Sequence, residues 1–119
     1  MKILNLIIKQ KYFDEIILGN KKQEFREIRP NSQSKYCELD EEGFCKEEDG
    51  ILIPRHYDAI RFFVGYKKDR ASALVKVVGA NIELFVDEDN NFIEYTHEGE
   101  IYLAAQVVYD LGDIIEKSV

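Results

Sequence analysis

The chain has 119 residues, of which 45% are apolar and 33% charged, and its net charge is −7. This length suits one domain and excludes two of ordinary size. No apolar run approaches the roughly 20 residues that a membrane-spanning helix needs. The apolar segment 3–8 is short and runs into Lys9, without the cleavage site of a signal peptide. We therefore expect a single cytoplasmic domain, residues 1–119, with no membrane partner.

The first predicted elements are a strand and a helix. Residues 3–8 are apolar and partly β-branched, which is typical of a buried strand. Segment 10–18 has one apolar stripe at helical spacing, formed by Tyr12, Phe13, Ile16 and Ile17. Gly19 directly follows this stripe and suits a left-handed helix C-cap.

A second strand and a long loop follow. Residues 22–28 alternate as a strand does, with Phe25 on one face. The opposite face carries Glu24, Arg26 and Ile28. Pro30 ends this strand. Residues 31–54 are polar, acidic and irregular, and we expect little regular structure in them.

The second half of the chain is mainly strands. We predict strands at 57–66, 71–86 and 101–109, turns at 67–70 and 87–91, weak structure at 92–100, and a strand or helical turn at 113–117. About five or six strands with one or two short helices, and no βαβ repeat, indicate an α+β domain of the small-barrel type.

Two cysteines, Cys37 and Cys45, are too few for a disulfide framework. We expect free thiols in an exposed acidic loop, as is usual in a reducing compartment. A zinc site with His56 and His97 is the alternative, but the spacing matches no CxxC or HxxxH pattern. The sequence therefore predicts no metal and no cofactor.

Charge is distributed unevenly along the chain. Residues 1–36 and 51–79 each carry a net +4, whereas residues 37–50 carry −6 and residues 80–119 carry −9. If folding joins the two basic blocks, the protein has a basic face that attracts phosphates despite its acidic total. Ordinary surface solvation is the alternative for either block alone.

One segment, Gly19-x-Lys21-x-x-Glu24-x-Arg26, resembles the GxKxxExR signature of ASCH domains. Further segments resemble the same family in the same order: the helix before the motif at 12–18, a characteristic stretch at 57–62 with 65–66 and 69–70, and the usual last strand at 111–116. The resemblance implies a PUA-like β-barrel, with residues 31–54 as a variable acidic insertion.

The motif residues suit an anionic ligand. A strand's period of two puts Glu24 and Arg26 on one side, with Lys21 at the strand entrance. Arg26 can bind phosphate through its bidentate fork, and Lys21 can act as a point charge, a nucleophile or a base. Glu24 can orient Lys21 or accept a proton. The alternative is an ion network of these three residues that only joins strand to helix.

Further binding residues are expected in the second basic block. Tyr66 follows a glycine beside two lysines and can stack on a base, and Arg70 ends the same turn. Arg61 lies mid-strand, where it is either solvated or a second phosphate contact. Tyr57 is expected in the core. The predicted binding set is Gly19, Lys21, Glu24, Arg26, Arg61, Tyr66 and Arg70.

Three functions remain open. The likeness of ASCH domains to PUA domains, which bind RNA, implies a binding module for RNA or a modified nucleotide. Some small ASCH proteins are amidohydrolases that deacetylate N4-acetylcytidine and others are described as ribonucleases, which implies a hydrolase with Lys21 and Glu24 as catalytic residues. The acidic segments 37–50 and 83–100 suggest a protein-interaction module.

The chain matches the amidohydrolase pattern only in part. The resemblance implies a lysine at position 21, a threonine at position 24 and a distant glutamate. Lys21 matches, whereas Glu24 replaces the threonine. The distant glutamate has three possible positions: Glu83, Glu88 and Glu94. RNA or a nucleotide is the expected partner, and whether the chain is an enzyme stays open.

Overall fold

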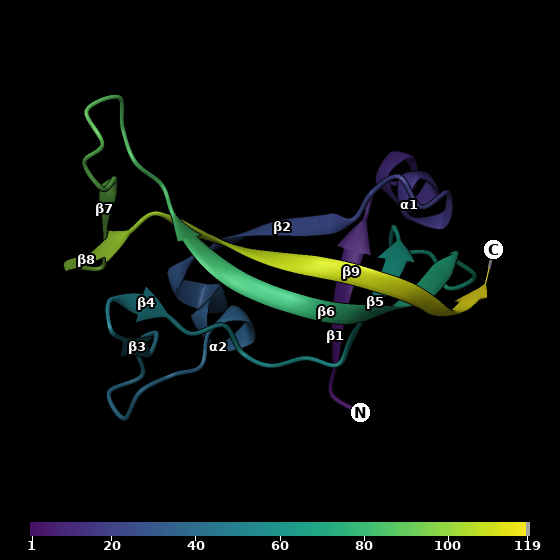
Figure 1. Cartoon of the computed structure of the whole chain (residues 1–119), viewed down its shortest axis with the longest axis horizontal. Coiled ribbons are helices and arrows are strands. Elements are labelled where there is room, and N and C mark those ends of the chain that lie inside the picture. The colour runs from purple at the N-terminus through teal and green to yellow at the C-terminus, as the bar shows by residue number, and fades with distance from the viewer. Residues whose placement is uncertain (119) are drawn as a thin grey trace. The chain divides into compact units, whose positions relative to one another are not determined.

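A computed structural model describes residues 1–118 (Figure 1). The fold is α+β, mostly strands with two short α-helices. The helices are α1 (Gln10–Ile17) and α2 (Gln33–Tyr36), the latter after a 3-10 turn η1 (Pro30–Ser32). The strands are β1 (Ile3–Ile8), β2 (Gln23–Ile28), β3 (Glu47–Glu48), β4 (Ile51–Leu52), β5 (Ala59–Val64), β6 (Ser72–Leu84), β7 (Glu94–His97), β8 (Glu100–Leu103) and β9 (Ala105–Ser118). None of the helices in this part of the chain is long and apolar enough to cross a membrane.

Five strands hydrogen-bond in the order β1-β5-β6-β9-β2, while β3-β4 and β7-β8 form two-stranded sheets. Over residues 1–118 this order starts at β1 and ends at β2, without closure into a barrel. The mostly-strand α+β class predicted from the sequence is thereby confirmed. The more specific PUA-like barrel stays a prediction.

The chain divides into two compact units. Unit 1 contains residues 1–24, residues 56–79 and the chain from Tyr109 onward. Unit 2 contains residues 25–55 and 80–108. Strands β2, β6 and β9 contribute residues to both units.

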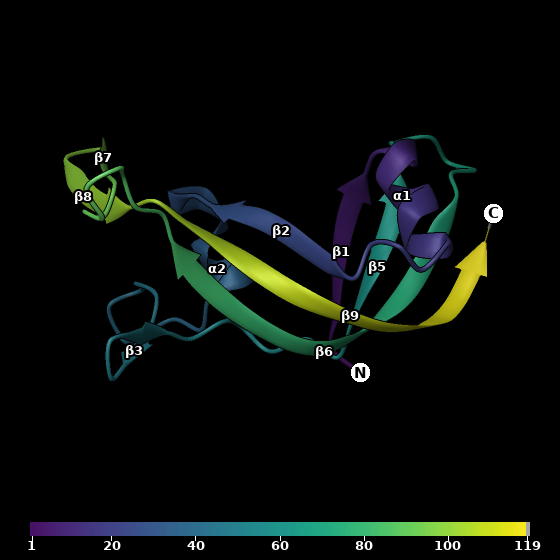
Figure 2. The same ribbon diagram turned by 45° about the horizontal axis from the view of Figure 1, so that its top comes forward.

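Unit 1 is built on the parallel pair β1–β5, in which Ile8 is opposite Val64 at the carboxyl ends. Alternate residues of β1 are buried, as the period of a strand requires: Leu4, Leu6 and Ile8. Helix α1 directly follows β1 and packs on β5, burying Phe13 and Ile16 (Figures 1 and 2). The predictions of a strand at 3–8 and a helix at 10–18 are confirmed.

The opposite end of the β1–β5 pair is fixed by Asp58. Its carboxylate accepts a hydrogen bond from the backbone N–H of Lys2 at 2.7 Å and contacts Nε2 of His56 at 3.0 Å. The hydrogen bond from Lys2 is the largest cause that lowers the pKa of Asp58 below its ordinary value of 3.8, and the His56 contact is the second. The charged carboxylate therefore stabilises the start of β1 beside β5.

Two glycines allow β6 and β9 to approach closely within unit 1. A Cβ on Gly112 would lie 2.7 Å from Cγ1 of Val78. A Cβ on Gly79 would lie 2.7 Å from a carboxylate oxygen of Asp110. Gly79 thus lies inside β6, where close strand approach rather than a break in the strand accounts for it.

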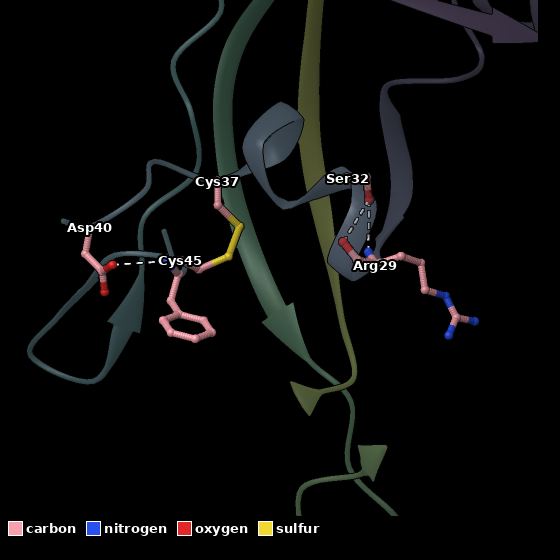
Figure 3. Close-up of a disulfide and its surroundings, with 6 residues drawn as sticks. Arg29, Ser32, Cys37, Asp40 and Cys45 are labelled. Atoms are coloured by element: carbon pink, nitrogen blue, oxygen red, sulfur yellow. Dashed lines mark hydrogen bonds between the residues drawn. A yellow bond between two sulfur atoms is a disulfide. The ribbon is translucent and has the colours of Figure 1, made fainter. Parts of the chain in front are cut away.

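In unit 2 the structure corrects the prediction of two free thiols. Cys37 and Cys45 form a disulfide, with their Cα atoms 5.4 Å apart (Figure 3). The prediction was wrong because it rested on the number of cysteines. The loop between them folds back so that Leu39 bridges Cys45, which brings the two sulfur atoms together. The alternative zinc site loses both of its thiols as a result.

Segment 31–54 also has more regular structure than its composition predicted. It contains α2 and the two-residue strands β3 and β4, which pair antiparallel. The backbone N–H of Glu38 donates to the carbonyl of Ile53 at 2.9 Å, and Nη1 of Arg55 donates to the carbonyl of Ser34 at the same distance. These hydrogen bonds join the beginning of the acidic segment to its end.

The β7–β8 hairpin supplies the other folded part of unit 2. Tyr95 on β7 is opposite Tyr102 on β8, and the two rings stack with centroids 5.7 Å apart. The strand predicted at 101–109 is broken at Ala104, where β8 ends and β9 begins. Ala104 instead accepts and donates backbone hydrogen bonds with Phe85 and Ile93.

We expect the disulfide to contribute about 2.5 kcal/mol to stability, the loop-entropy value for a bridge of this short sequence separation. Urea unfolding measured with and without reductant should show this loss in the native protein. A Cys37→Ala/Cys45→Ala variant should be insensitive to reductant. Two reactive thiols per chain in the unreduced, folded protein would contradict the pairing.

Candidate functional site

The Gly19 turn fixes the backbone at the entrance to β2. Gly19 has φ +79°, the left-handed conformation predicted for a helix C-cap. The backbone N–H groups of Asn20 and Lys21 both donate to the carbonyl of Glu15, at 2.9 and 3.1 Å. The end of α1 therefore sets the direction in which Lys21 leaves the helix.

Lys21 lies between an aromatic ring and a carboxylate. Its Nζ is 3.6 Å from Oε1 of Glu24 and 5.8 Å from the centroid of the Tyr12 ring. The Glu24 side chain is only 8% exposed, whereas that of Lys21 is 19% exposed. A nearly buried carboxylate paired with a lysine that still reaches solvent is an arrangement that positions the ammonium group. The predicted pairing of Lys21 with Glu24 is thus present.

A cleft of about 210 Å³ lies beside this pair in unit 1. One wall comprises residues 16–19 with Lys21 and Lys22, and the other comprises Val75 and residues 111–114. The backbone N–H of Leu111 donates to the carbonyl of Lys22 at 2.8 Å, which joins the two walls. Two of the segments that carry the family resemblance therefore line one cleft.

Sequence reasoning missed Lys22 and Asp113 as cleft residues. Lys22 occupies a variable position of the motif directly after Lys21, and this position was the signal in the sequence that could have identified it. Asp113 lies about 90 residues further along the chain, and only the pairing of β9 brings it to the cleft. The cleft thus contains two lysines and one carboxylate.

The remaining predicted residues do not all join this cleft. Arg26 belongs to unit 2 and is partly exposed, so its place in the site stays a prediction. Arg61 donates from Nη1 to Oε1 of Glu116 at 2.9 Å, within unit 1. It is therefore neither simply solvated nor free to bind a phosphate without competition from Glu116.

Arg70 and Tyr66 occupy one turn but differ in role. Nη1 of Arg70 donates to the carbonyl of Gly65 at 3.0 Å, and its guanidinium carbon lies 4.0 Å from the Phe63 ring centroid. Arg70 thus stabilises the turn from within. Tyr66 is 86% exposed. Tyr57 is buried and meets Tyr109 edge to face, which confirms its predicted place in the core.

The three glutamates considered as the distant catalytic residue all belong to unit 2. Glu83 accepts a hydrogen bond from Nε2 of Gln106 at 3.0 Å. Glu88 lies in the turn before β7, and Glu94 is exposed at the start of that strand. Which of the three is the distant glutamate, and its place relative to Lys21, therefore stays a prediction.

Charge is divided between the two units. Unit 1 contains eleven Lys and Arg residues against eight Asp and Glu, a net +3. Unit 2 contains five against fifteen, a net −10. Most of the two basic blocks of the sequence thus come together in one compact unit, whereas both acidic segments, 37–50 and 83–100, fall in the other. The interaction role of those segments stays a prediction.

A second cleft of about 410 Å³ lies in unit 2, lined by residues 29–31 and 95–97. The Arg29 guanidinium lies 5.6 Å from the Tyr95 ring centroid and pairs with Oε1 of Glu27 at 2.7 Å. Burial is the main cause that raises the pKa of Tyr95 above its ordinary value of 10.0. Because this cleft lies in a strongly acidic unit, it suits a phosphate less well than the first.

Comparisons of the chain with protein-family models, with curated proteins and with solved structures found no match. Two features of the chain point to a function: the chemistry of the cleft in unit 1 and the motif resemblance of residues 19–26. Both concern the same turn between α1 and β2.

We expect Gly19→Ala to lower the free energy of unfolding by about 1–2 kcal/mol, since an L-residue is strained at this φ. Nothing lies within 4 Å of the added Cβ, so the effect comes from the backbone rather than from a clash. Gly19→Asn should cost less, because asparagine tolerates the left-handed region. Leu18→Ala, at an exposed neighbour, is the matched control. Equal stability of Gly19→Ala and native protein in urea would contradict the cap.

Proposed function

We propose that this chain is an ASCH domain that binds RNA or a modified nucleotide in the cleft of unit 1. The single observation that carries the proposal is a lysine-lined cleft in the one unit with net positive charge. The motif segment 19–22 and the last-strand segment 111–114 meet at this cleft, as a shared site for them requires. In this proposal the five-stranded sheet corresponds to the PUA-like barrel of that family.

The size of the cleft favours one nucleotide unit over a longer stretch of chain. Pockets for drug-sized ligands have roughly 300–1,000 Å³, and this cleft is smaller. The base or the phosphate group of a single nucleotide is of suitable size to enter it. Lys21 and Lys22 supply ammonium donors for phosphate oxygens. The apolar Leu18, which is 71% exposed, and the half-buried Ile114 offer surface to the ring of a base. Glu24 acts here by positioning Lys21.

Nucleotide binding should depend on Lys21. Loss of one charge-assisted hydrogen bond corresponds to about 1.5–3 kcal/mol, so Lys21→Ala should weaken binding of cytidine monophosphate roughly 10- to 100-fold. Isothermal titration calorimetry at low and high salt measures this, and the native affinity should fall as salt rises. Lys46→Ala is the matched control, because Lys46 pairs with Glu38 and Glu48 on unit 2 and should not affect binding.

Two results would count against the binding role. One is a native protein that shows no heat and no spectral shift with any nucleotide or short RNA up to millimolar ligand. The other is equal loss of affinity in Lys46→Ala and Lys21→Ala, because general charge and not the cleft would then account for the binding.

A hydrolase is the second candidate, supported by the carboxylate held 3.6 Å from the Lys21 amine. Hydrolysis of N4-acetylcytidine forms a bond from water oxygen to the acetyl carbon and breaks the amide C–N bond, which yields acetate and cytidine. Lys21 would stabilise the oxyanion, and Glu24 would take a proton from water and return it to the leaving amine. In this hydrolase mechanism Glu24 takes the position at which the family's amidohydrolases have a threonine, so the catalytic role at that position would differ from theirs.

For the hydrolase we expect acetate release from N4-acetylcytidine that disappears in Lys21→Ala and falls at least 100-fold in Glu24→Gln. Chromatography of the nucleoside product and enzymatic assay of acetate measure the reaction independently. Circular dichroism of both variants confirms that they fold. A native protein that binds N4-acetylcytidine but releases no acetate would leave the binding role standing and remove the hydrolase.

A further inference from the structure

The carboxyl ends of β1 and β5 bring two lysine-containing segments to one edge of the sheet. These strands run parallel, and Ile8 is opposite Val64 at their ends. The segment that leaves β1 begins at Lys9, and the segment that leaves β5 begins at Gly65. Figures 1 and 2 both show the two arrowheads side by side. Residues 9–11 and 65–70 therefore start from neighbouring points, although more than 50 residues separate them in sequence.

The turn at 65–70 has a defined shape that presents Tyr66 to solvent. Gly65 has φ +66°, which reverses the chain directly after β5. Arg70 holds both ends of the turn, because its side chain bonds the Gly65 carbonyl and lies over the Phe63 ring. Tyr66 itself is 86% exposed, the largest exposed fraction of any aromatic residue within the part of the chain that the structure describes. An anchored turn thus carries an uncovered ring.

The charges around Tyr66 are mainly positive. Four exposed lysines belong to the two segments: Lys9, Lys11, Lys67 and Lys68. The acids of the same turn and helix are Asp69 in the turn and Asp14 and Glu15 on α1. Asp14 accepts a hydrogen bond from Gln10 at 2.8 Å. A single exposed aromatic residue is ordinary on a protein surface. An exposed ring with four unburied lysines at the same sheet edge is the combination that binds a stacked base and its flanking phosphates.

We propose that this basic edge, formed by Lys9, Lys11, Tyr66, Lys67 and Lys68, binds single-stranded nucleic acid. Tyr66 stacks on an unpaired base while the lysines contact phosphates on either side of it. A duplex keeps its base faces covered, so it gains the lysine contacts without the stacking contact. The inference rests on the proposed nucleic-acid role of unit 1 and adds the strandedness of the ligand.

Fluorescence anisotropy with a labelled 12-nucleotide RNA of mixed sequence, single-stranded or annealed to its complement, tests this. Tyr66→Ala should weaken single-strand binding about 5- to 100-fold, and Tyr66→Phe should retain it. Neither variant should alter duplex affinity. Lys67→Ala/Lys68→Ala should reduce the slope of log affinity against log salt by about 1.4 for the single strand. Phe92→Ala removes a ring that is 57% exposed on unit 2 and serves as the matched control.

The basic edge is overturned if Tyr66→Ala binds the single strand as tightly as the native protein or if Phe92→Ala weakens it equally. It is also overturned if the duplex binds as tightly as the single strand, or if polyglutamate displaces the RNA at equal charge concentration. These failures differ from failure of the cleft. If Lys21→Ala loses cytidine monophosphate binding while Tyr66→Ala binds RNA normally, only the basic edge is refuted. If Tyr66→Ala weakens RNA binding while Lys21→Ala still binds cytidine monophosphate, only the cleft is refuted.

Discussion

The parallel pairing of β1 with β5 is the constraint on which both proposed binding surfaces depend. It requires a connection that crosses from one strand to the other, and α1 begins that connection immediately after β1. Phe13 and Ile16 pack inward, and the helix ends at Ile17. The turn at Gly19 then sets Lys21 beside Glu24. The same pairing places the segments after β1 and β5 at one sheet edge.

The uneven distribution of charge between the two units is the reason we expect an anionic ligand at these surfaces. The chain is acidic overall, yet unit 1 carries +3 while unit 2 carries −10. Most exposed charges contribute little to stability, so this division matters chiefly for what each unit attracts. The cleft beside Lys21 and Lys22 is the smaller of the two clefts described, but it is the one in a unit that favours an anion.

Local features of the fold were predictable from the sequence, and contacts between distant segments were not. Apolar periodicity placed β1, α1 and β2, and the glycine after the apolar stripe indicated the left-handed cap. The Cys37–Cys45 disulfide escaped prediction because it depends on how the acidic loop folds back. The pairing of Arg61 with Glu116 escaped it for the same reason, since 55 residues separate the two. For the site, the motif located Lys21 and Glu24, whereas the second wall of the cleft required the strand pairing of β9.

Backbone amide shift mapping is the sharpest check on the proposal that unit 1 holds the nucleotide ligand. Isotope-labelled protein is titrated with a short single-stranded RNA while amide shifts are followed. We predict that the largest shift changes fall at residues 19–22 and 111–114 around the cleft, with a second group at 9–11 and 66–68. Changes confined to unit 2, or none at saturating RNA, would contradict it.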